Sequence, residues 1–186
     1  MEAFSYLGVT GSYSRRELAV MMNTTKSGIT DENFYARMFE RCRDDIERGY
    51  ITILFWTGMH GSSLKELTLD NLRREGNRHY LKWRRLKTNK ALEAPIPPDK
   101  LEVVRTFLAS RRKPSLRWIN ERLQAMGKEA GYDGVSTMTF RHTRCIRLIS
   151  MNVPLSAIKQ MMGCSNQVIE RAYGKYTPEQ LRELMP

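Results

Sequence analysis

A run of apolar residues without a polar face is the feature that most limits how this chain can fold. Residues 50–56 read Tyr-Ile-Thr-Ile-Leu-Phe-Trp, and neither an alternating nor a helical period divides them into a buried and an exposed side. The segment, which ends before Gly58, must therefore lie in the core. Periodicity alone leaves both a strand and a helix open. A membrane span needs about 18 consecutive apolar residues, so this run is too short to be one.

The length of 186 residues fits one domain, or one domain with a short appendage. Apolar residues make up 41% of the chain, enough to bury a core without disulfides. The three cysteines are widely spaced, which favours a reducing compartment. The sequence has no CxxC, no HExxH and no clustered His, which excludes a structural zinc. The N-terminus lacks the basic and apolar regions of a secretory signal.

The chain is basic, and the excess charge is concentrated in its middle. Lys and Arg number 31 against 20 Asp and Glu, a formal net charge of +11. Residues 73–122 hold fifteen Lys and Arg against five Asp and Glu, a net charge of +10. This concentration of positive charge favours the hypothesis that the protein binds a polyanion over the alternative that it is basic without such a partner. Nucleic acid is the first candidate for that polyanion. An anionic membrane surface is the second candidate, but no basic amphipathic helix with bulky apolar residues supports it.

The remaining patterns predict a mainly α-helical domain with one small antiparallel β-sheet, an α+β fold. Apolar or aromatic residues alternate with basic ones on both sides of a polar turn at 87–90, which predicts a β-hairpin of Tyr80–Arg84 and Ala91–Ile96. Caps, apolar spacing and terminal Gly or Pro predict helices at 15–22, 30–42, 99–110, 115–130, 139–151, 156–162 and 165–173.

The predicted helix at 139–151 carries three arginines at a spacing of three residues: Arg141, Arg144 and Arg147. At about 100° per residue they occupy an arc of roughly 120°, opposite an apolar side. Spacing alone favours a solvated helix face over a phosphate-binding one. The residues that follow this helix favour phosphate binding.

The C-terminal part of the chain resembles the tyrosine recombinases, the phage-type integrases and Xer-like resolvases. Phe140-Arg141-His142-Thr143 is similar to the end of their His-x-Leu-Arg-His-Thr block. Val153–Ser165, which ends Met-Met-Gly-Cys-Ser, is similar to their short helix ending in Leu-Gly-His-Ser. Tyr173 follows Cys164 by nine residues, the spacing at which the family has its tyrosine.

Weaker similarities lie upstream. Thr57–Leu67 resembles the family's Thr-Gly-x-Arg-x-Ser-Glu-Leu segment, and Lys87-Thr88 and Pro95-Ile96-Pro97 stand where the family has its hairpin lysine and Ile-Pro. The family has a buried helix before the first segment, which implies that residues 50–56 are helical. The resemblance spans about residues 14–180. We expect a leader at 1–13 and a catalytic domain at 14–186 that includes a short tail helix at about 177–186. The family also has an N-terminal DNA-clamping domain, and only about thirteen residues precede the predicted helix at 15–22, so we expect that domain to be absent. The chain is then either a fragment of a longer integrase or a minimal enzyme that acts with partners.

The chemistry that the resemblance implies is phosphoryl transfer on double-stranded DNA without metal, ATP or other cofactor. A tyrosine hydroxyl attacks the scissile phosphate, a 3′-phosphotyrosyl bond forms and the 5′-hydroxyl leaves. The resemblance implies that Tyr173 is the nucleophile, with Tyr176 as the alternative. It makes Arg141 the second of two phosphate-binding arginines and Lys87 the general acid, with Lys90 as the alternative.

Several positions depart from the family's pattern: His60 replaces the first arginine, Met138 the first histidine, Cys164 the later His or Trp, and Ser63 a glutamate. Neither Met nor Cys donates to phosphate as imidazole does, so donors are missing. His60 can supply one N–H, and Arg144 and His142 are further candidates. We expect a divergent but catalytic integrase, since the nucleophile, Arg141 and Lys87 remain; a degenerate DNA-binding relative and a type IB topoisomerase-like enzyme are the alternatives.

Further side chains are expected to bind DNA: Arg84, Arg85, Lys90, Arg144, His142, Arg111 and Arg112. The expected partner is a duplex attachment site, on which a protein that is monomeric alone assembles. No membrane partner is expected. The resemblance implies a cytoplasmic, DNA-associated protein encoded by a prokaryote, virus or plasmid.

Overall fold

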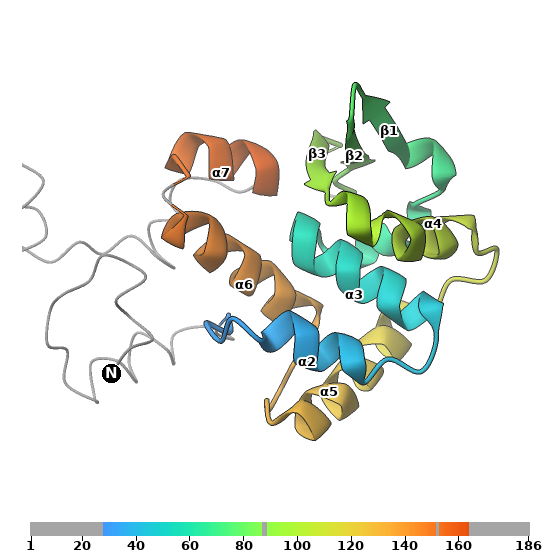
Figure 1. Cartoon of the computed structure of the whole chain (residues 1–186), viewed down its shortest axis with the longest axis vertical. Helices are drawn as coiled ribbons and strands as arrows, with labels where there is room; N and C mark the ends of the chain where they lie inside the picture. Colours follow the sequence, from blue (N-terminus) through green and yellow to red (C-terminus); the bar gives the residue numbers. More distant parts are fainter. Residues whose placement is uncertain (1–27, 87–88, 152, 164–186) are drawn as a thin grey trace, which may run out of the picture.

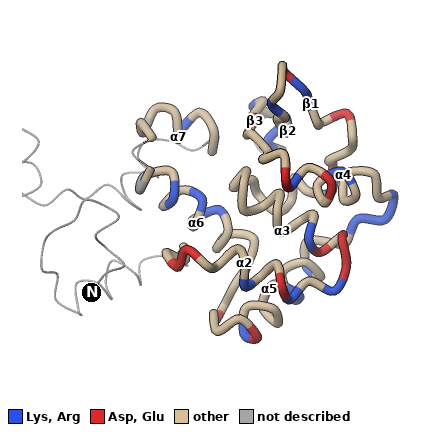
Figure 2. Tube along the Cα trace, in the orientation of Figure 1, with Lys and Arg blue, Asp and Glu red and all other residues tan. Residues whose placement is uncertain are grey.

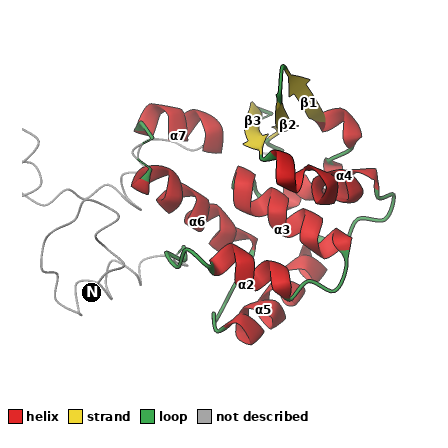
Figure 3. Cartoon of the chain, in the orientation of Figure 1, coloured by secondary structure: helices red, strands yellow, loops and turns green. Residues whose placement is uncertain are grey.

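The computed structural model describes residues 28–163 except 87, 88 and 152. The predicted helices at 15–22 and 165–173, the leader and the tail helix lie outside the described residues. Within them, the predicted fold class is confirmed: helices predominate and one small antiparallel sheet stands beside them (Figure 1, Figure 3).

The helices are α2 (Phe34–Glu40), α3 (Asp45–Thr57), α4 (Leu101–Ala109), α5 (Leu116–Ala130), α6 (Thr137–Ser150) and α7 (Leu155–Met162). Short 3₁₀ turns occupy Gly61–Glu66, Leu69–Asn71 and Pro98–Lys100. The strands are β1 (Leu72–Glu75), β2 (Arg78–Arg84) and β3 (Ala91–Ile96) in the order β1-β2-β3. Among the described residues, no helix combines the length and apolar character needed to cross a membrane.

The apolar run at 50–56 forms most of α3, so the predicted buried helix is confirmed. Tyr50, Ile51, Ile53 and Leu54 are fully buried, because α2, α4, α6 and β3 all pack against this helix. The side chain of Asp44 caps the start of α3 by accepting a hydrogen bond from the Glu47 N–H (2.8 Å).

The predicted hairpin is also confirmed, as β2 and β3, and β1 is a third strand that the sequence analysis did not predict. Side chains alternate along the pair: Leu81 and Trp83 face the core opposite Ala94 and Leu92. The turn is closed by Arg85 N–H to Lys90 O (2.9 Å) and Asn89 N–H to Arg85 O (2.7 Å). The backbone of Arg85 is therefore fixed at the end of β2.

A small apolar cluster holds α7 on α6. It consists of Cys145 and Leu148 from α6 and Ile158 and Met162 from α7. α7 also packs on β3, so this helix contacts both α6 and the hairpin. Gly163 ends α7 in the left-handed conformation (φ +62°), as the sequence predicts.

A buried carboxylate joins the start of α3 to α5. Glu47 accepts hydrogen bonds from Arg122 Nε (2.9 Å) and from Arg43 Nη2 (2.7 Å), and its side chain is 1% exposed. Burial alone would raise the pKa of Glu47, but the hydrogen bonds from Arg122 and Arg43 outweigh it and hold that pKa below its usual value.

Arg122→Met should lower the free energy of unfolding by about 2–4 kcal/mol at pH 7, because it removes one partner of a buried ion pair. Arg117→Met, which removes an exposed partner of Glu121 on the same helix, should change it little. The lowered pKa makes the Glu47 contribution complete above about pH 4.3 and lost as the pH falls through the folded pKa. Urea unfolding from pH 3 to 7 checks this; a gap between the parent protein and Arg122→Met that does not narrow in acid would contradict it.

Candidate functional site

The guanidinium of Arg141 joins the ends of two helices. This side chain leaves α6 and is 8% exposed. Its Nη1 donates to the carbonyl of Gly58, just after α3 (2.7 Å), and its Nη2 to the carbonyl of Met162, the last residue of α7 (2.6 Å). Carbonyls at a helix C-terminus carry partial negative charge and lack intrahelical donors, so a cation there is stabilising.

Arg85 reaches the same end of α7 from the hairpin. Its Nη1 donates to the carbonyl of Gly163 (2.5 Å), the residue next to the Met162 acceptor of Arg141. Two arginines from different elements, 56 residues apart in the sequence, thus bind successive carbonyls of one turn.

His60 lies beside these two arginines and is the residue that immediately precedes the 3₁₀ turn Gly61–Glu66. Burial lowers its pKa to about 4, and the charges of Arg141 and Arg85 add to this effect. In the described part of the chain its Nε2 has no hydrogen-bond partner. An anion bound here would favour the protonated, donating imidazole.

Close packing explains the glycine at position 58, in the Thr-Gly segment before His60. Gly58 is left-handed (φ +61°), and a Cβ at this position would lie 2.7 Å from Met162 Cε and 3.1 Å from Arg144 Cβ. Its backbone therefore approaches α6 and α7 more closely than a side chain would allow. This close approach brings the Gly58 carbonyl within reach of Arg141.

The arc of arginines on α6 is not a solvated face, which corrects the interpretation that spacing alone favours. Arg144 is 6% exposed, and its guanidinium lies 5.8 Å from the Trp56 ring centroid. Burial lowers the pKa of Arg144 to about 10, and Arg147 adds to the shift. Arg147 lies over Phe55 at 5.0 Å. His142 is half-buried, and burial together with Arg141 lowers its pKa.

The other predicted residues divide into three groups. Arg84 and Lys90 are exposed on the hairpin, where Arg84 Nη1 contacts Asn89 O (3.3 Å). Arg111 and Arg112 are exposed in the α4–α5 loop, which Figure 2 shows on the other side of α3 from α6. Lys87, Cys164, Tyr173 and Tyr176 lie outside the described residues. The structure therefore brings His60, Arg85 and Arg141 together and does not join Arg111 and Arg112 to them.

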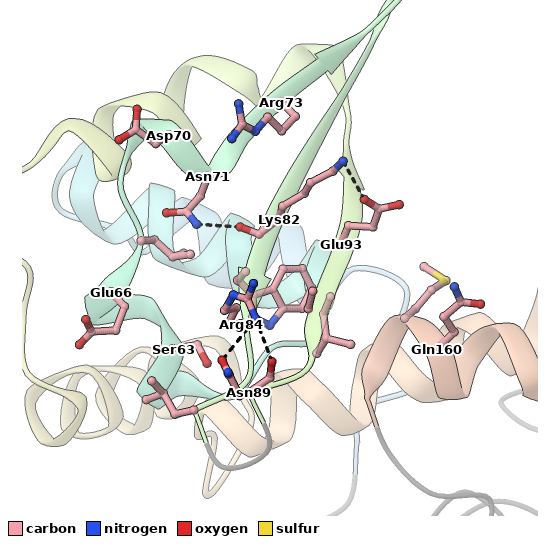
Figure 4. Close-up of a pocket in the computed structure, with 16 residues that line it drawn as sticks. Ser63, Glu66, Asp70, Asn71, Arg73, Lys82, Arg84, Asn89, Glu93 and Gln160 are labelled. Carbon is pink, nitrogen blue, oxygen red and sulfur yellow. Dashed lines mark hydrogen bonds and ion pairs between the residues drawn. The ribbon is translucent and has the colours of Figure 1, made fainter.

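A separate open groove of about 810 Å³ runs along the exposed side of the sheet (Figure 4). Its walls come from the 3₁₀ turns after His60, the three strands and α7. Acidic and basic side chains both line it, and Lys82 is paired with Glu93 (3.3 Å). Neither His60 nor Arg141 lines this groove. The sequence analysis did not predict it; the outward positions of the alternating strands were the only signal.

The sequence model of the phage integrase family matches residues 22–180. The chain therefore belongs to the phage integrase family. No curated protein sequence matches it.

Solved structures share the fold at low sequence identity. The XerH site-specific recombinase bound to its difH substrate has a TM-score of 0.69 at 13% identity, over 82% of this chain and 50% of that one. The Tn1549 transposon integrase in complex with a circular intermediate DNA has a TM-score of 0.69 at 16% sequence identity, over 88% of this chain and 66% of that one. XerA recombinase has a TM-score of 0.62 at 18% sequence identity, over 83% of this chain and 62% of that one. The chain thus spans about half to two thirds of the length of these proteins.

Gly58→Ala should destabilise the protein more than Gly76→Ala. Both glycines are left-handed (φ +61° and +59°), but a Cβ at Gly76 meets nothing within 4 Å. Gly76→Ala should lower the free energy of unfolding by about 1 kcal/mol, because alanine disfavours the left-handed backbone conformation. Gly58→Ala should lower it further, because the new Cβ must also displace Met162 and Arg144. Equal losses in urea unfolding would contradict the close packing of α3, α6 and α7 at this point.

Proposed function

We propose that this chain is the catalytic part of a site-specific DNA recombinase or integrase, which cuts and rejoins strands through a 3′-phosphotyrosyl intermediate. One observation carries the proposal: two guanidinium groups from separate elements bind the successive carbonyls of Met162 and Gly163, their charges act on the nearby His60, and the sequence continues from Gly163 to Tyr173. No described acidic side chain is hydrogen-bonded or ion-paired to Arg85 in this cluster.

In the proposed reaction the Tyr173 oxygen attacks the scissile phosphorus and the bond to the 5′-oxygen breaks. The phenol proton passes to water. A phenol with an ordinary pKa of about 10 needs neighbouring positive charge to lose this proton, and the arginines supply that charge. Arg141 stabilises the charge that develops on the non-bridging oxygens. Lys87 gives a proton to the departing 5′-oxygen, and the reverse step regenerates the phenol and the DNA strand.

Double-stranded DNA is the proposed partner. Arg84 and Lys90 on the hairpin and Arg111 and Arg112 in the α4–α5 loop are exposed and available to phosphates. XerH and the Tn1549 integrase are described in complexes with DNA, which supports this assignment. We propose residues 14–186 as the catalytic domain of a DNA-associated protein that is monomeric alone and assembles on its attachment site.

A non-catalytic DNA-binding relative is the second candidate, favoured by two features. The Arg141 guanidinium is bonded to two main-chain carbonyls, so this arginine can serve the fold without binding phosphate. The replacements at Met138 and Cys164 also remove donors that the family pattern would supply.

Nicked suicide duplexes that tile the DNA flanking the gene separate these functions. The recombinase should give an SDS-resistant protein–DNA band at one sequence, and Tyr173→Phe should abolish it without abolishing binding. Salt-sensitive binding with no such band would contradict the enzyme and support the DNA-binding relative. Relaxation of supercoiled plasmids regardless of sequence would support a topoisomerase-like enzyme instead.

Lys87→Ala should lower cleavage of an ordinary duplex about 10²–10⁴-fold, because it removes the general acid. A substrate with a 5′-bridging sulfur should restore the rate, since a thiolate leaves without a proton. Lys90→Ala on both substrates is the matched control. If the 5′-bridging sulfur substrate restores the rate of Lys90→Ala but not that of Lys87→Ala, the general acid is Lys90 and not Lys87.

A further inference from the structure

We propose that Arg85 supplies the second phosphate-binding guanidinium of this site, in place of the arginine that His60 replaces. The inference rests on the proposed function and assigns one more residue to the same reaction. Arg85 then acts with Arg141 on the non-bridging oxygens of the scissile phosphate, and His60 contributes a single donor between them.

The need for such a group follows from the chemistry of position 60. An imidazole offers at most one N–H to a ligand, whereas a guanidinium offers a fork of parallel donors and a permanent charge. With His60 alone, the five-coordinate phosphorus would be stabilised by one arginine and one weakly basic ring. A second arginine close to His60 would remove this deficit.

The position of Arg85 meets that need. Its Nη1 binds Gly163 O and Arg141 Nη2 binds Met162 O, so one peptide unit separates the two acceptors. The charge of Arg85 acts on His60 along with that of Arg141. Three cationic or donor groups thus lie near the end of α7, although they come from the turn after β2, from α6 and from the segment after α3.

Unsatisfied donors point to an anion at this place. In the described part of the chain, Arg85 Nε and His60 Nε2 are both buried without a hydrogen-bond partner. A buried polar group left unpaired costs about 1–3 kcal/mol. Nε–H belongs to the edge of the guanidinium that binds phosphate bidentately, so a phosphate bound there would satisfy it.

The hairpin holds Arg85 more firmly than an ordinary surface arginine. Its N–H and C=O are both bonded across the turn to Lys90 and Asn89. Its neighbour Arg84 is exposed and bonded to Asn89 instead. Lys87 follows Arg85 by two residues, so one hairpin would carry both the proton donor and a phosphate clamp.

Single-turnover cleavage of the suicide duplex tests this assignment. Arg85→Ala and Arg85→Lys should each form the covalent complex about 10²–10³-fold more slowly, with DNA affinity changed less than about threefold. Arg78→Ala, which removes an exposed charge from the start of β2, the strand that ends just before Arg85, should leave the rate unchanged. In the Arg85→Ala background, His60→Arg should recover at least about tenfold, because it returns a guanidinium to the site.

A purely structural role for Arg85 predicts something different. Loss of the bond to Gly163 would then lower the melting temperature and the rate together, Arg85→Lys would restore both, and His60→Arg would recover nothing. That result overturns the assignment, as does an Arg85→Ala protein as active as Arg78→Ala; the proposed function survives either.

A parent protein that forms no covalent complex defeats the proposed function instead. Phosphate binding then decides the assignment: addition of inorganic phosphate to the full chain should shift the Arg85 Nε–H and His60 ring resonances in NMR spectra. Phosphate should shift both resonances in Arg78→Ala as in the parent protein, and the shift of the His60 ring resonances should be lost in Arg85→Ala; this result would support the assignment of Arg85 to the phosphate site. No response of Arg85 to phosphate overturns it.

Discussion

The two hydrogen bonds of the Arg141 guanidinium are the interaction on which the arrangement of this site depends. They connect α6 to the ends of α3 and α7, so three helices that are distant in sequence meet at one point. The bonds are possible because Gly58 lets the backbone after α3 approach α6 and α7 without a Cβ in the way. Burial lowers the pKa of His60, and the charge of the same guanidinium adds to this shift. Fold and candidate chemistry therefore share one side chain.

The concentration of positive charge at Gly163 has an electrostatic consequence. Arg85 donates to the Gly163 carbonyl, and Arg141 donates to the carbonyls of Gly58 and Met162, which carry partial negative charge. His60, whose pKa burial lowers to about 4, is neutral beside these two arginines, and under the proposed function a phosphate is the anion that binds here. An incoming phosphate would add the missing charge and make a donating imidazole favourable. In this view the basic middle of the chain attracts DNA, while this cluster selects one phosphate.

The elements that local patterns specify were predictable from the sequence. The buried run at 50–56, the alternation in β2 and β3, and the Gly163 helix end each depend on neighbours within a few residues. The sequence analysis missed β1, because Leu72–Glu75 has two arginines and no clear alternation; its pairing with β2 stabilises it. The burial of Arg144 was missed for a similar reason, since it depends on Trp56. The approach of Arg85 to Gly163 joins residues 78 apart, and no short pattern encodes such a contact.

A structure of Tyr173→Phe bound to an uncleaved duplex tests the central claim most directly. We expect one DNA phosphate between Arg141, Arg85 and His60, with oxygens about 3 Å from nitrogens of all three. It further predicts that Arg85 Nε, unpartnered among the described residues, donates to this phosphate. A duplex bound elsewhere, with Arg141 and Arg85 engaged only by the carbonyls of Gly58, Met162 and Gly163, would contradict the account.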